Sequence, residues 1–263
     1  MSFAIPNKML VALAACMFAL PALAAPGSTT PVKRETRSHP GTVPYGQVIE
    51  NCKEPNMIAL TFDDGPGPYT GTILDILTTK EVKATFFLNA MNTGDMLDES
   101  SGRPDNVRRM YAAGHHVASH SYSHKDLDSV LPDVRRDEIV KNEAAFAQVI
   151  GVLPTYFRPP YGNCNDACLG LLNELGYHVI TWSLDTLDWE KNIPASKKVF
   201  ADQVQSHQQA SYIALSHDIH EGTVKELVGY MIDVAKENGY RLVTVGECLG
   251  DPRENWYRPA SYV

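Results

Sequence analysis

From Met57 onward, short apolar runs alternate along the chain with longer amphipathic segments. Short apolar runs that stop at turn-forming residues predict strands, and longer runs with helical periodicity predict helices. Strands are predicted over residues 57–62, 84–88, 115–119, 155–158, 177–184, 212–217 and 241–245. Helices are predicted over residues 69–80, 103–113, 133–150, 165–175, 196–208 and 222–238. This alternation indicates an α/β fold, and about seven parallel strands in a single domain favour a (β/α) barrel over an open doubly wound sheet.

The first 24 residues have the pattern of a secretory signal peptide. Lys8 precedes an apolar run over residues 9–20, and small residues follow up to Ala24. A membrane anchor is the alternative interpretation, but the run is short for a bilayer and ends in a cleavage-like site. We therefore expect residues 1–24 to be removed from a secreted protein that has no membrane anchor.

Residues 25–45 predict a linker or pro-segment because they are rich in Pro, Gly, Ser and Thr. The pair Lys33-Arg34 resembles the dibasic sites of kexin-type processing proteases, and cleavage after Arg34 would leave a mature chain that begins at Glu35. The folded domain is expected over residues 50–250, and residues 251–263 form a tail that is either packed or loose.

Composition and charge restrict the class of partner. The 263 residues are 44% apolar and 21% charged, as in ordinary globular proteins. The formal net charge is −8, and every charged residue before Glu35 is basic, so the processed chain is more acidic still. An acidic protein is poorly suited to bind nucleic acid and can accept a neutral or cationic partner. We expect a monomer.

Four cysteines remain once Cys16 leaves with the signal peptide. An even number in an oxidising compartment predicts two disulfides, and four cysteines allow three pairings. We favour Cys52 with Cys248, which would tie the two ends of the domain together, and the local pair of Cys164 with Cys168. The cysteine spacings do not form the paired knuckles of a cysteine-based zinc site.

Two adjacent carboxylates, Asp63 and Asp64, follow the first predicted strand and precede a Gly-Pro turn. Neighbouring residues at the end of a strand are expected to point to opposite sides, which suits one metal ligand and one base better than a shared proton. A divalent cation would offset the repulsion between the two groups. The alternative is that Asp-Asp-Gly is only a turn sequence.

Two histidines, His120 and His124, follow the third predicted strand. Histidines four residues apart share one face if the stretch turns helically, and both imidazoles then reach one metal. With Asp64 they form an Asp-His-His set, which leaves a coordination position for water. Ordinary loop or capping histidines are the alternative, and His115 and His116 in the strand itself are interpreted as structural.

Three further polar segments follow later strands. Arg158 precedes two prolines that restrict the backbone, and near Asp63 it would keep that carboxylate ionised, although a surface ion pair is the alternative. Trp189 follows an acidic residue in a loop, an arrangement that suits a wall for stacking sugars but also a simple core position. His217 ends the sixth strand and could act as a general acid if Asp188 raises its pKa.

Together these segments resemble the polysaccharide deacetylases of carbohydrate esterase family 4 (the NodB homology domain), and among them most closely the secreted fungal chitin deacetylases. The matching segments are TFDDGP at 61–66, HSYSH at 120–124, RPPY at 158–161, DTLDW at 185–189 and LSH at 215–217. They occur in the family's order, and the four cysteines resemble the two disulfides of the fungal members.

The resemblance implies a role for each matching side chain. Asp63 would be the general base, oriented by Arg158, and His217 paired with Asp188 would protonate the leaving amine. Three residues would hold a divalent metal, zinc or in some members cobalt: Asp64, His120 and His124. The remaining matches would contact the acetyl group, through the backbone N–H of Tyr161 and through the side chains of Trp189 and Leu215.

The resemblance therefore implies a distorted, incomplete (β/α) barrel and a metal-dependent hydrolase. Its substrate would be chitin or N-acetylglucosamine oligomers, its products chitosan and acetate, and its place extracellular or at the cell wall. Two alternatives stay open: a deacetylase of acetyl xylan or a peptidoglycan-like glycan, and a glycan-binding protein without catalysis.

Overall fold

The structure, a computed structural model, describes residues 1–4 and 37–262. The chain divides into two units, Met1–Glu35 and Thr36–Val263, and the fold described below is that of the second unit. Beyond residues 1–4, the expected signal peptide lies outside the described residues, and so does the dibasic pair at 33–34.

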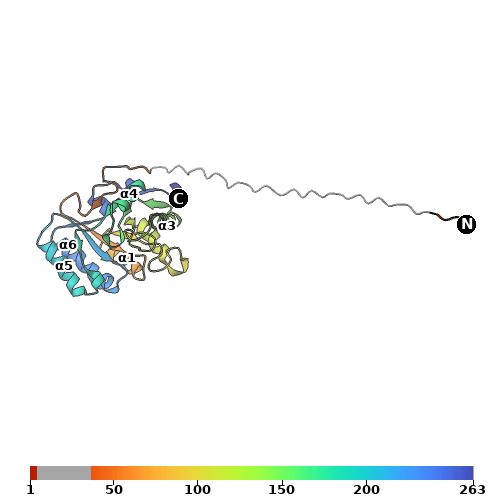
Figure 1. The fold of residues 1–263 in the computed structure, drawn as a ribbon. Coiled ribbons are helices and arrows are strands. Elements are labelled where there is room, and N and C mark those ends of the chain that lie inside the picture. Colours follow the sequence, from red (N-terminus) through yellow and green to blue (C-terminus); the bar gives the residue numbers. More distant parts are fainter. Residues whose placement is uncertain (5–36, 263) are drawn as a thin grey trace. The chain divides into compact units, whose positions relative to one another are not determined.

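The second unit is built around one sheet whose strands all run parallel (Figure 1). Along the sheet the strand order is β1-β7-β6-β4-β3-β2-β9-β8, and β10 pairs with β2 beside this path. The strands are β1 (Val48–Ile49), β2 (Met57–Asp63), β3 (Thr85–Leu88), β4 (His116–Ser119), β6 (Tyr156–Phe157), β7 (His178–Ile180), β8 (Leu184–Asp185), β9 (Tyr212–His217) and β10 (Arg241–Val243).

The strand β2 lies at the centre of the sheet, and all of its residues are buried. It pairs with β9 along most of its length, with β10 near its start and with β3 near its end. A strand covered on both faces needs the near-continuous apolar sequence seen here. Because side chains alternate between faces, Ala59 packs inside the curled sheet while Leu60 and Phe62 pack outside it, and Asp63 ends the strand on the inner face.

The sheet curls into an incomplete barrel. The strands β7 and β8 lie toward opposite edges of the sheet, yet only residues 181–183 connect them, a reach of at most roughly 14 Å. The predicted single strand over 177–184 is therefore wrong. The connecting segment bridges the opening, since the Thr181 N–H donates to the Ile49 carbonyl at 2.9 Å and the Ser183 N–H donates to the Ile213 carbonyl at 3.1 Å.

Helices cover the outside of the sheet, and Figure 1 shows α5 and α6 side by side. They are α1 (Thr70–Thr79), α2 (Arg103–Ala112), α3 (Pro132–Ile150), α4 (Asp166–Glu174), α5 (Ile193–Gln205), α6 (Val228–Glu237) and the short α7 (Val245–Cys248). A π-helical turn over Thr223–Leu227 leads into α6, so the predicted helix over 222–238 is present with an irregular first turn. In the part of the chain that the structure describes, no helix is long and apolar enough to cross a membrane.

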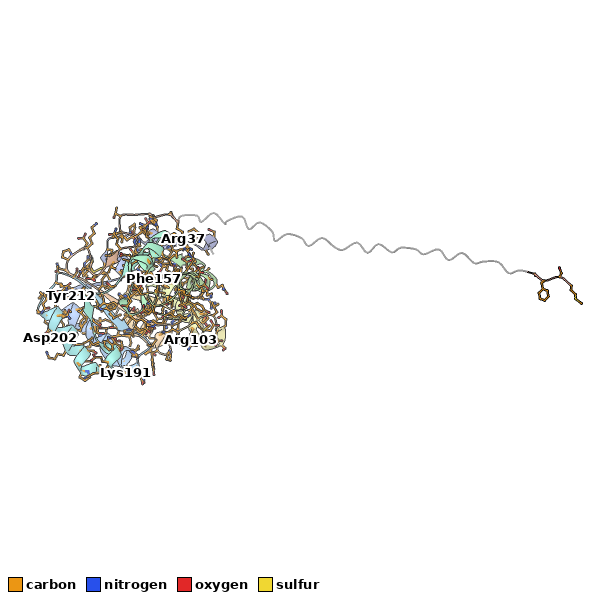
Figure 2. The ribbon with its side chains drawn as sticks, in the orientation of Figure 1. Arg37, Arg103, Phe157, Lys191, Asp202 and Tyr212 are labelled. Atoms are coloured by element: carbon orange, nitrogen blue, oxygen red, sulfur yellow. A yellow bond between two sulfur atoms is a disulfide. The ribbon has the colours of Figure 1, made fainter. Side chains whose placement is uncertain are left out.

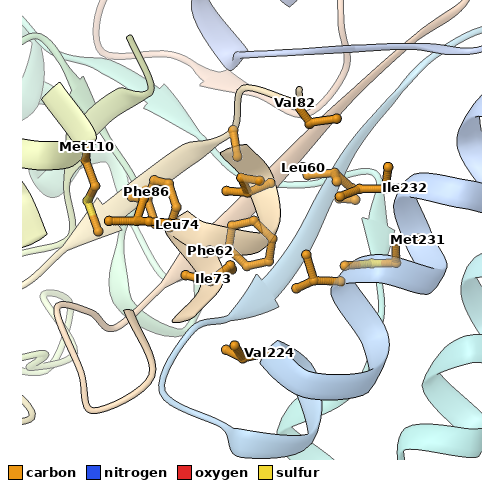
Figure 3. Close-up of a cluster of buried hydrophobic side chains, with 14 of the residues drawn as sticks. Leu60, Phe62, Ile73, Leu74, Val82, Phe86, Met110, Val224, Met231 and Ile232 are labelled. Atoms are coloured by element: carbon orange, nitrogen blue, oxygen red, sulfur yellow. The ribbon is translucent and has the colours of Figure 1, made fainter. Parts of the chain in front are cut away.

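The main hydrophobic core lies between the sheet and the helices (Figure 3). This core contains Phe62 of β2, Ile73 of α1 and Met231 of α6. All three side chains are fully buried. Truncation of a buried Phe to Ala costs about 3–5 kcal/mol, so this layer holds β2 and its terminal carboxylates firmly in place.

The segments that flank the expected domain pack onto the same unit. Arg37, labelled in Figure 2, donates from its two terminal guanidinium nitrogens, Nη1 and Nη2, to the carboxylate of the buried Glu143 of α3. At the other end, β11 (Tyr257–Pro259) pairs antiparallel with β5 (Val152–Pro154), and Trp256 is only 3% exposed. The described part of the tail is thus packed.

Two disulfides join Cys52 to Cys248 and Cys164 to Cys168, the pairs favoured from the sequence. The first spans 196 residues. A loop of this length gives about 5 kcal/mol of stabilisation in the chain-entropy view. It fastens α7 to the segment just before β2.

Candidate metal centre and active site

A cavity of about 410 Å³ opens at the carboxyl ends of the strands. Parallel strands of a barrel bring the residues that follow them together at this end, which is where barrel enzymes place their chemistry. The lining residues are Asp63, Asp64, His120, His124, Pro159, Tyr161, Trp182, Asp185, Trp189, Leu215, His217 and His220. Residues from all five motif segments therefore meet in one cavity.

The carboxylates of Asp63 and Asp64 both line this cavity, so the expectation that they point to opposite sides is wrong. Asp64 has a φ of 76°, in the left-handed region, and this turn of the backbone brings its side chain round to the same side. The Nε2 atom of His120 lies 3.8 Å from Asp63 Oδ2 and 3.6 Å from Asp64 Oδ1.

His120 and His124 are brought together by an irregular loop and not by the helical turn expected from their spacing. Ser121 and His124 both have positive φ values, 67° and 59°, and the Ser121 hydroxyl accepts a hydrogen bond from the His124 N–H. The two imidazole rings lie 5.0 Å apart between centroids. The two histidines that the spacing singled out therefore lie close together, but through a loop and not through a helical turn.

The ring of His120 is oriented by the backbone of another motif segment. Its Nδ1 atom lies 2.6 Å from the carbonyl oxygen of Arg158, a partner that can only accept a hydrogen bond. Nδ1 must therefore carry the proton, and the lone pair of the ring is on Nε2, which faces Asp64.

Asp64, His120 and His124 fit a divalent cation. One ligand atom from each lies within 4.8 Å of the others. Asp64 Oδ1 is buried without a hydrogen-bond donor, although it lies 3.2 Å from the Nε2 atom of His124. Burial lowers the pKa of both histidines, and neutral imidazole is the form that binds metal. A buried carboxylate oxygen that faces the Nε2 lone pair of His120 and accepts no hydrogen bond is costly without a cation and favourable with one.

Asp63 is held by the buried guanidinium of Arg158. Its Oδ1 accepts a hydrogen bond of 2.8 Å from Arg158, which also donates to the hydroxyl of Thr61 and the carbonyl of Thr181. Burial raises the pKa of Asp63 to about 6, even though Arg158 and His217 lower it. The sequence predicts that Arg158 keeps Asp63 ionised and oriented; in the structure Arg158 binds Asp63 and limits the rise in its pKa.

His217 and Asp188 form a second oriented pair. Asp188 is fully buried, and its Oδ1 lies 2.8 Å from His217 Nδ1. Its Oδ2 accepts from the His217 N–H and from the Thr223 hydroxyl, both at 2.7 Å. Burial opposes protonation of His217, but the hydrogen bond and charge of Asp188 raise its pKa to about 9. This raised pKa favours the protonated imidazole at neutral pH.

Aromatic side chains form the rim of the cavity. Tyr161 and Trp189 are 64% and 49% exposed, which is unusual for such large rings, while Leu215 is buried beside them in the lining. Tyr161 has a φ of 61°, which the rigid Pro-Pro segment before it helps to hold.

Sequence reasoning missed three residues at the site. Trp182 lines the cavity and lies over Arg158, but it fell inside the strand wrongly predicted over 177–184. His220 lines the cavity beside His217, and a second histidine three residues after the first was an available signal.

Asp218 is the third missed residue, a buried carboxylate that accepts a hydrogen bond from the Thr70 hydroxyl. A side chain at Gly65 would meet the Asp218 carboxylate at 2.5 Å. The glycine of the TFDDGP segment is therefore required by this close approach.

Comparisons with known proteins agree with this geometry. The sequence model of the polysaccharide deacetylase family matches residues 50–180. A chitin deacetylase from Colletotrichum lindemuthianum is 45% identical over 221 residues, which cover 82% of this chain and 88% of the relative. A chitin deacetylase from Arthroderma benhamiae is 44% identical over 223 residues, which cover 84% of this chain and 59% of that longer relative.

A solved structure is also similar. The structure of the chitin deacetylase from C. lindemuthianum matches with a TM-score of 0.78 and 44% sequence identity. The match covers 82% of this chain and 97% of that chain.

Proposed function

The chain belongs to the polysaccharide deacetylase family, and we propose that it hydrolyses the N-acetyl groups of N-acetylglucosamine residues in chitin or chitin oligomers. The products would be acetate and the free amine of chitosan. The observation that carries this proposal is the content of one cavity: a three-residue metal set, flanked by a carboxylate held by Arg158 and by an imidazolium held by Asp188.

Asp64, His120 and His124 would hold the metal, and zinc suits this set of one oxygen and two nitrogen donors. Cobalt(II) accepts the same kinds of ligand. When bound, a divalent metal supplies Lewis acidity, which polarises the acetamide carbonyl and makes water more acidic.

Asp63 would act as the general base. Its Oδ1 is occupied by Arg158, while its Oδ2 points toward His120 and the cavity. Oδ2 would accept a proton from the water that attacks the acetamide carbon, so that a new C–O bond forms. A pKa of about 6 leaves the carboxylate mostly ionised above neutrality and still basic enough to take a proton.

His217 would act as the general acid. The amine leaves as the C–N bond breaks, and it is a poor leaving group unless it is protonated. The imidazolium of His217, held by Asp188, would give its proton to this nitrogen. Asp188 orients the ring through Nδ1, which leaves Nε2 as the donor atom.

The acetyl group and the sugar would contact the rim of the cavity. The backbone N–H of Tyr161 would donate to the oxyanion that develops on the acetamide oxygen, and Leu215 would contact the methyl group. Trp189 is exposed enough to stack on a pyranose ring. The acidic net charge of the chain is compatible with a cationic product.

We also propose that the protein is secreted as a monomer after removal of residues 1–24, with a further cut after Arg34. The disulfides support an oxidising destination. Sequencing the N-terminus of protein secreted from a eukaryotic host would test both cuts, since the mature chain should begin near Ala25 or at Glu35. Light scattering of the same sample gives the oligomeric state.

The decisive test is acetate release from chitin oligomers before and after chelation. We expect release to stop with a chelator and to return with zinc or cobalt(II). Acetate release that persists without metal would contradict the mechanism. Parallel assays with acetyl xylan and with peptidoglycan separate the substrates, because activity on one of these and none on chitin oligomers would keep the mechanism and replace the substrate.

A further inference from the structure

One buried side chain connects the two loops that carry the proposed metal ligands. Asn89 follows β3 directly and is only 1% exposed. Because β3 pairs with β2 on one side and with β4 on the other, Asn89 lies between the loop that begins at Asp64 and the loop that begins at His120.

Asn89 makes hydrogen bonds to both loops. Its backbone N–H donates to the carbonyl of Gly65, next to Asp64, at 2.9 Å. Its side-chain Nδ2 donates to the carbonyls of His120 and Ser121, the latter at 2.9 Å. Among the residues described in this region, Asn89 alone makes hydrogen bonds to the backbone of both ligand loops.

The orientation of the Asn89 amide follows from its acceptors. Two carbonyl oxygens lie on one side of the group, so the NH₂ must face them, because a flipped amide would place three oxygen atoms together. The opposite atom, Oδ1, is buried and has no hydrogen-bond donor. A buried acceptor without a partner costs about 1–3 kcal/mol, so this residue is not explained by fold stability alone.

The backbone that Asn89 holds is conformationally unfavourable. Ser121 has a φ of 67°, and its left-handed conformation is what returns His124 toward His120. A non-glycine residue in this region costs about 1–3 kcal/mol and persists only where its surroundings fix it. The hydrogen bond from Asn89 to the Ser121 carbonyl is one such constraint.

We propose that Asn89 is a positioning residue for the metal centre, which sets the separation between Asp64 and the two histidines by joining their loops. This inference rests on the proposed metal site. Hydrogen bonds that orient ligands typically change metal affinity about 10- to 100-fold when they are removed. Removal of the Asn89 side chain should therefore weaken metal binding more than it destabilises the fold.

Asn142 of α3 offers a matched control. It is fully buried, accepts from the Ala90 N–H at 2.8 Å, and donates to the Leu88 carbonyl and the Ser119 hydroxyl at 2.9 and 2.8 Å. It makes a similar number of buried hydrogen bonds around the end of β3, but none of them goes to a proposed ligand residue. Its removal should destabilise the same region without releasing the ligand loops.

The experiment measures zinc affinity by competition with a chromophoric chelator for the wild type, Asn89→Ala and Asn142→Ala, with thermal unfolding of each metal-free protein. We expect Asn89→Ala to weaken zinc binding about 10- to 100-fold and Asn142→Ala to change it less than about threefold, at comparable losses of Tm. The visible spectrum of the cobalt(II) form should change for Asn89→Ala and not for Asn142→Ala. Asn89→Ser keeps one donor and should lie between wild type and Asn89→Ala.

The outcomes separate this inference from the metal site itself. A wild type that binds no zinc would overturn the metal site and the inference together. If the wild type binds zinc and Asn89→Ala or Asn89→Ser binds it with equal affinity, the inference about Asn89 is overturned and the metal site is not. Equal weakening by Asn142→Ala would also overturn it, because the effect would then reflect general loosening of β3. If Asn89→Ala does not fold, the comparison of Asn89→Ser with wild type decides.

Discussion

Buried histidines lie at both ends of the barrel, and their neighbours differ. His116 begins β4 at the amino end, where its ring stacks on Trp256 at 4.3 Å between centroids and meets Tyr156 edge-on at 4.5 Å. His120 follows the same strand at the carboxyl end, where oxygens of Asp63 and Asp64 lie within 4 Å of its Nε2. The two side chains lie on the same face of β4 and its extension, and both are buried.

The difference shows that burial does not separate the proposed ligand His120 from the structural His116. Burial lowers the pKa of both His116 and His120 well below the usual value. The two histidines differ in the groups that surround their rings. Aromatic rings surround His116 and offer it packing, whereas buried carboxylates face His120 and need a cation to compensate them.

The two ends also differ in how they are held. Around the cavity, Asp64, Ser121, His124 and Tyr161 all have positive φ values between 59° and 76°. Such conformations are unfavourable for residues other than glycine, and they also occur at Asn56 and Glu81 before β2 and β3. The amino end alone is fastened by the disulfide between Cys52 and Cys248. The carboxyl end therefore serves function, and the amino end serves stability.

The largest effect that would test this division is expected for His124→Ala. Removal of one of three ligands should abolish zinc binding and reduce acetate release from chitin oligomers by about 1,000-fold or more, because several kcal/mol of transition-state stabilisation depend on the metal. His124 is partly exposed, so the fold should survive with a nearly unchanged Tm of the metal-free protein.

The control for this prediction is His116→Phe at the other end of the same strand. Phenylalanine can keep the stack on Trp256, and the variant should bind zinc and release acetate like the wild type. If His116→Phe lost metal affinity as His124→Ala does, the two ends of the barrel would not be functionally distinct.

A smaller effect is expected for Asp188→Asn, which alters the proposed acid without touching a metal ligand. Asp188 raises the pKa of His217 to about 9 against the effect of burial. Without this carboxylate, burial should lower the pKa to about 6.5 or less. A general acid must be protonated, so the wild type should lose kcat above about pH 9 and the variant above about pH 6.5, a loss of at least about 30-fold at pH 8.

The measurement is kcat against pH from 6 to 10 at saturating zinc and chitin oligomer, with zinc affinity determined at pH 8 as the control. An alkaline limb that stays near pH 9 in Asp188→Asn would show that His217 is not the group that limits kcat at high pH. An unchanged zinc affinity in the variant excludes an indirect effect on the metal.

The alternation of strands and helices was readable from the sequence because most strands are buried on both faces and most helices are amphipathic. β9 was predicted over the residues that the structure assigns to it, Tyr212–His217. The run over 177–184 failed because apolar residues occur both in strands and in a segment that bridges the opening of the barrel. β1 was missed, since two residues of strand carry no periodicity.

The sequence predicted which residues form the candidate site but not how they are arranged in space. The motifs brought Asp63, Asp64, His120 and His124 to attention, and the structure places all four in one cavity. The positive φ values that turn Asp64 and His124 inward leave no sequence signal when the residue is not glycine. Asn89 was missed for a related reason, because its role lies in hydrogen bonds between backbone segments that only the fold brings together.

The smallest expected effect concerns the stability of the amino end in acid. Burial lowers the pKa of His116, the electrostatic effects of His178 and Arg253 act in the same direction, and its ring neighbours are aromatic. In the unfolded chain its pKa is about 6.5. Below that pH the unfolded state binds a proton that the folded state does not, so the free energy of unfolding falls as pH falls, by up to about 1.4 kcal/mol per pH unit.

Replacement of His116 by Phe removes this proton from the unfolded state and should flatten the acid dependence of stability. At pH 7.5 the variant should be slightly less stable, by about 1 kcal/mol, because the Gly246 N–H loses the Nδ1 acceptor that lies 3.3 Å away. Between pH 6.5 and 5 it should lose up to about 2 kcal/mol less than the wild type. Urea unfolding of both proteins with chelator at pH 7.5, 6.5 and 5 measures this difference, since His120 and His124 are common to both and cancel. Parallel stability curves would mean that His116 takes up a proton within the fold, and the aromatic surroundings of the amino end would then not keep its histidines neutral.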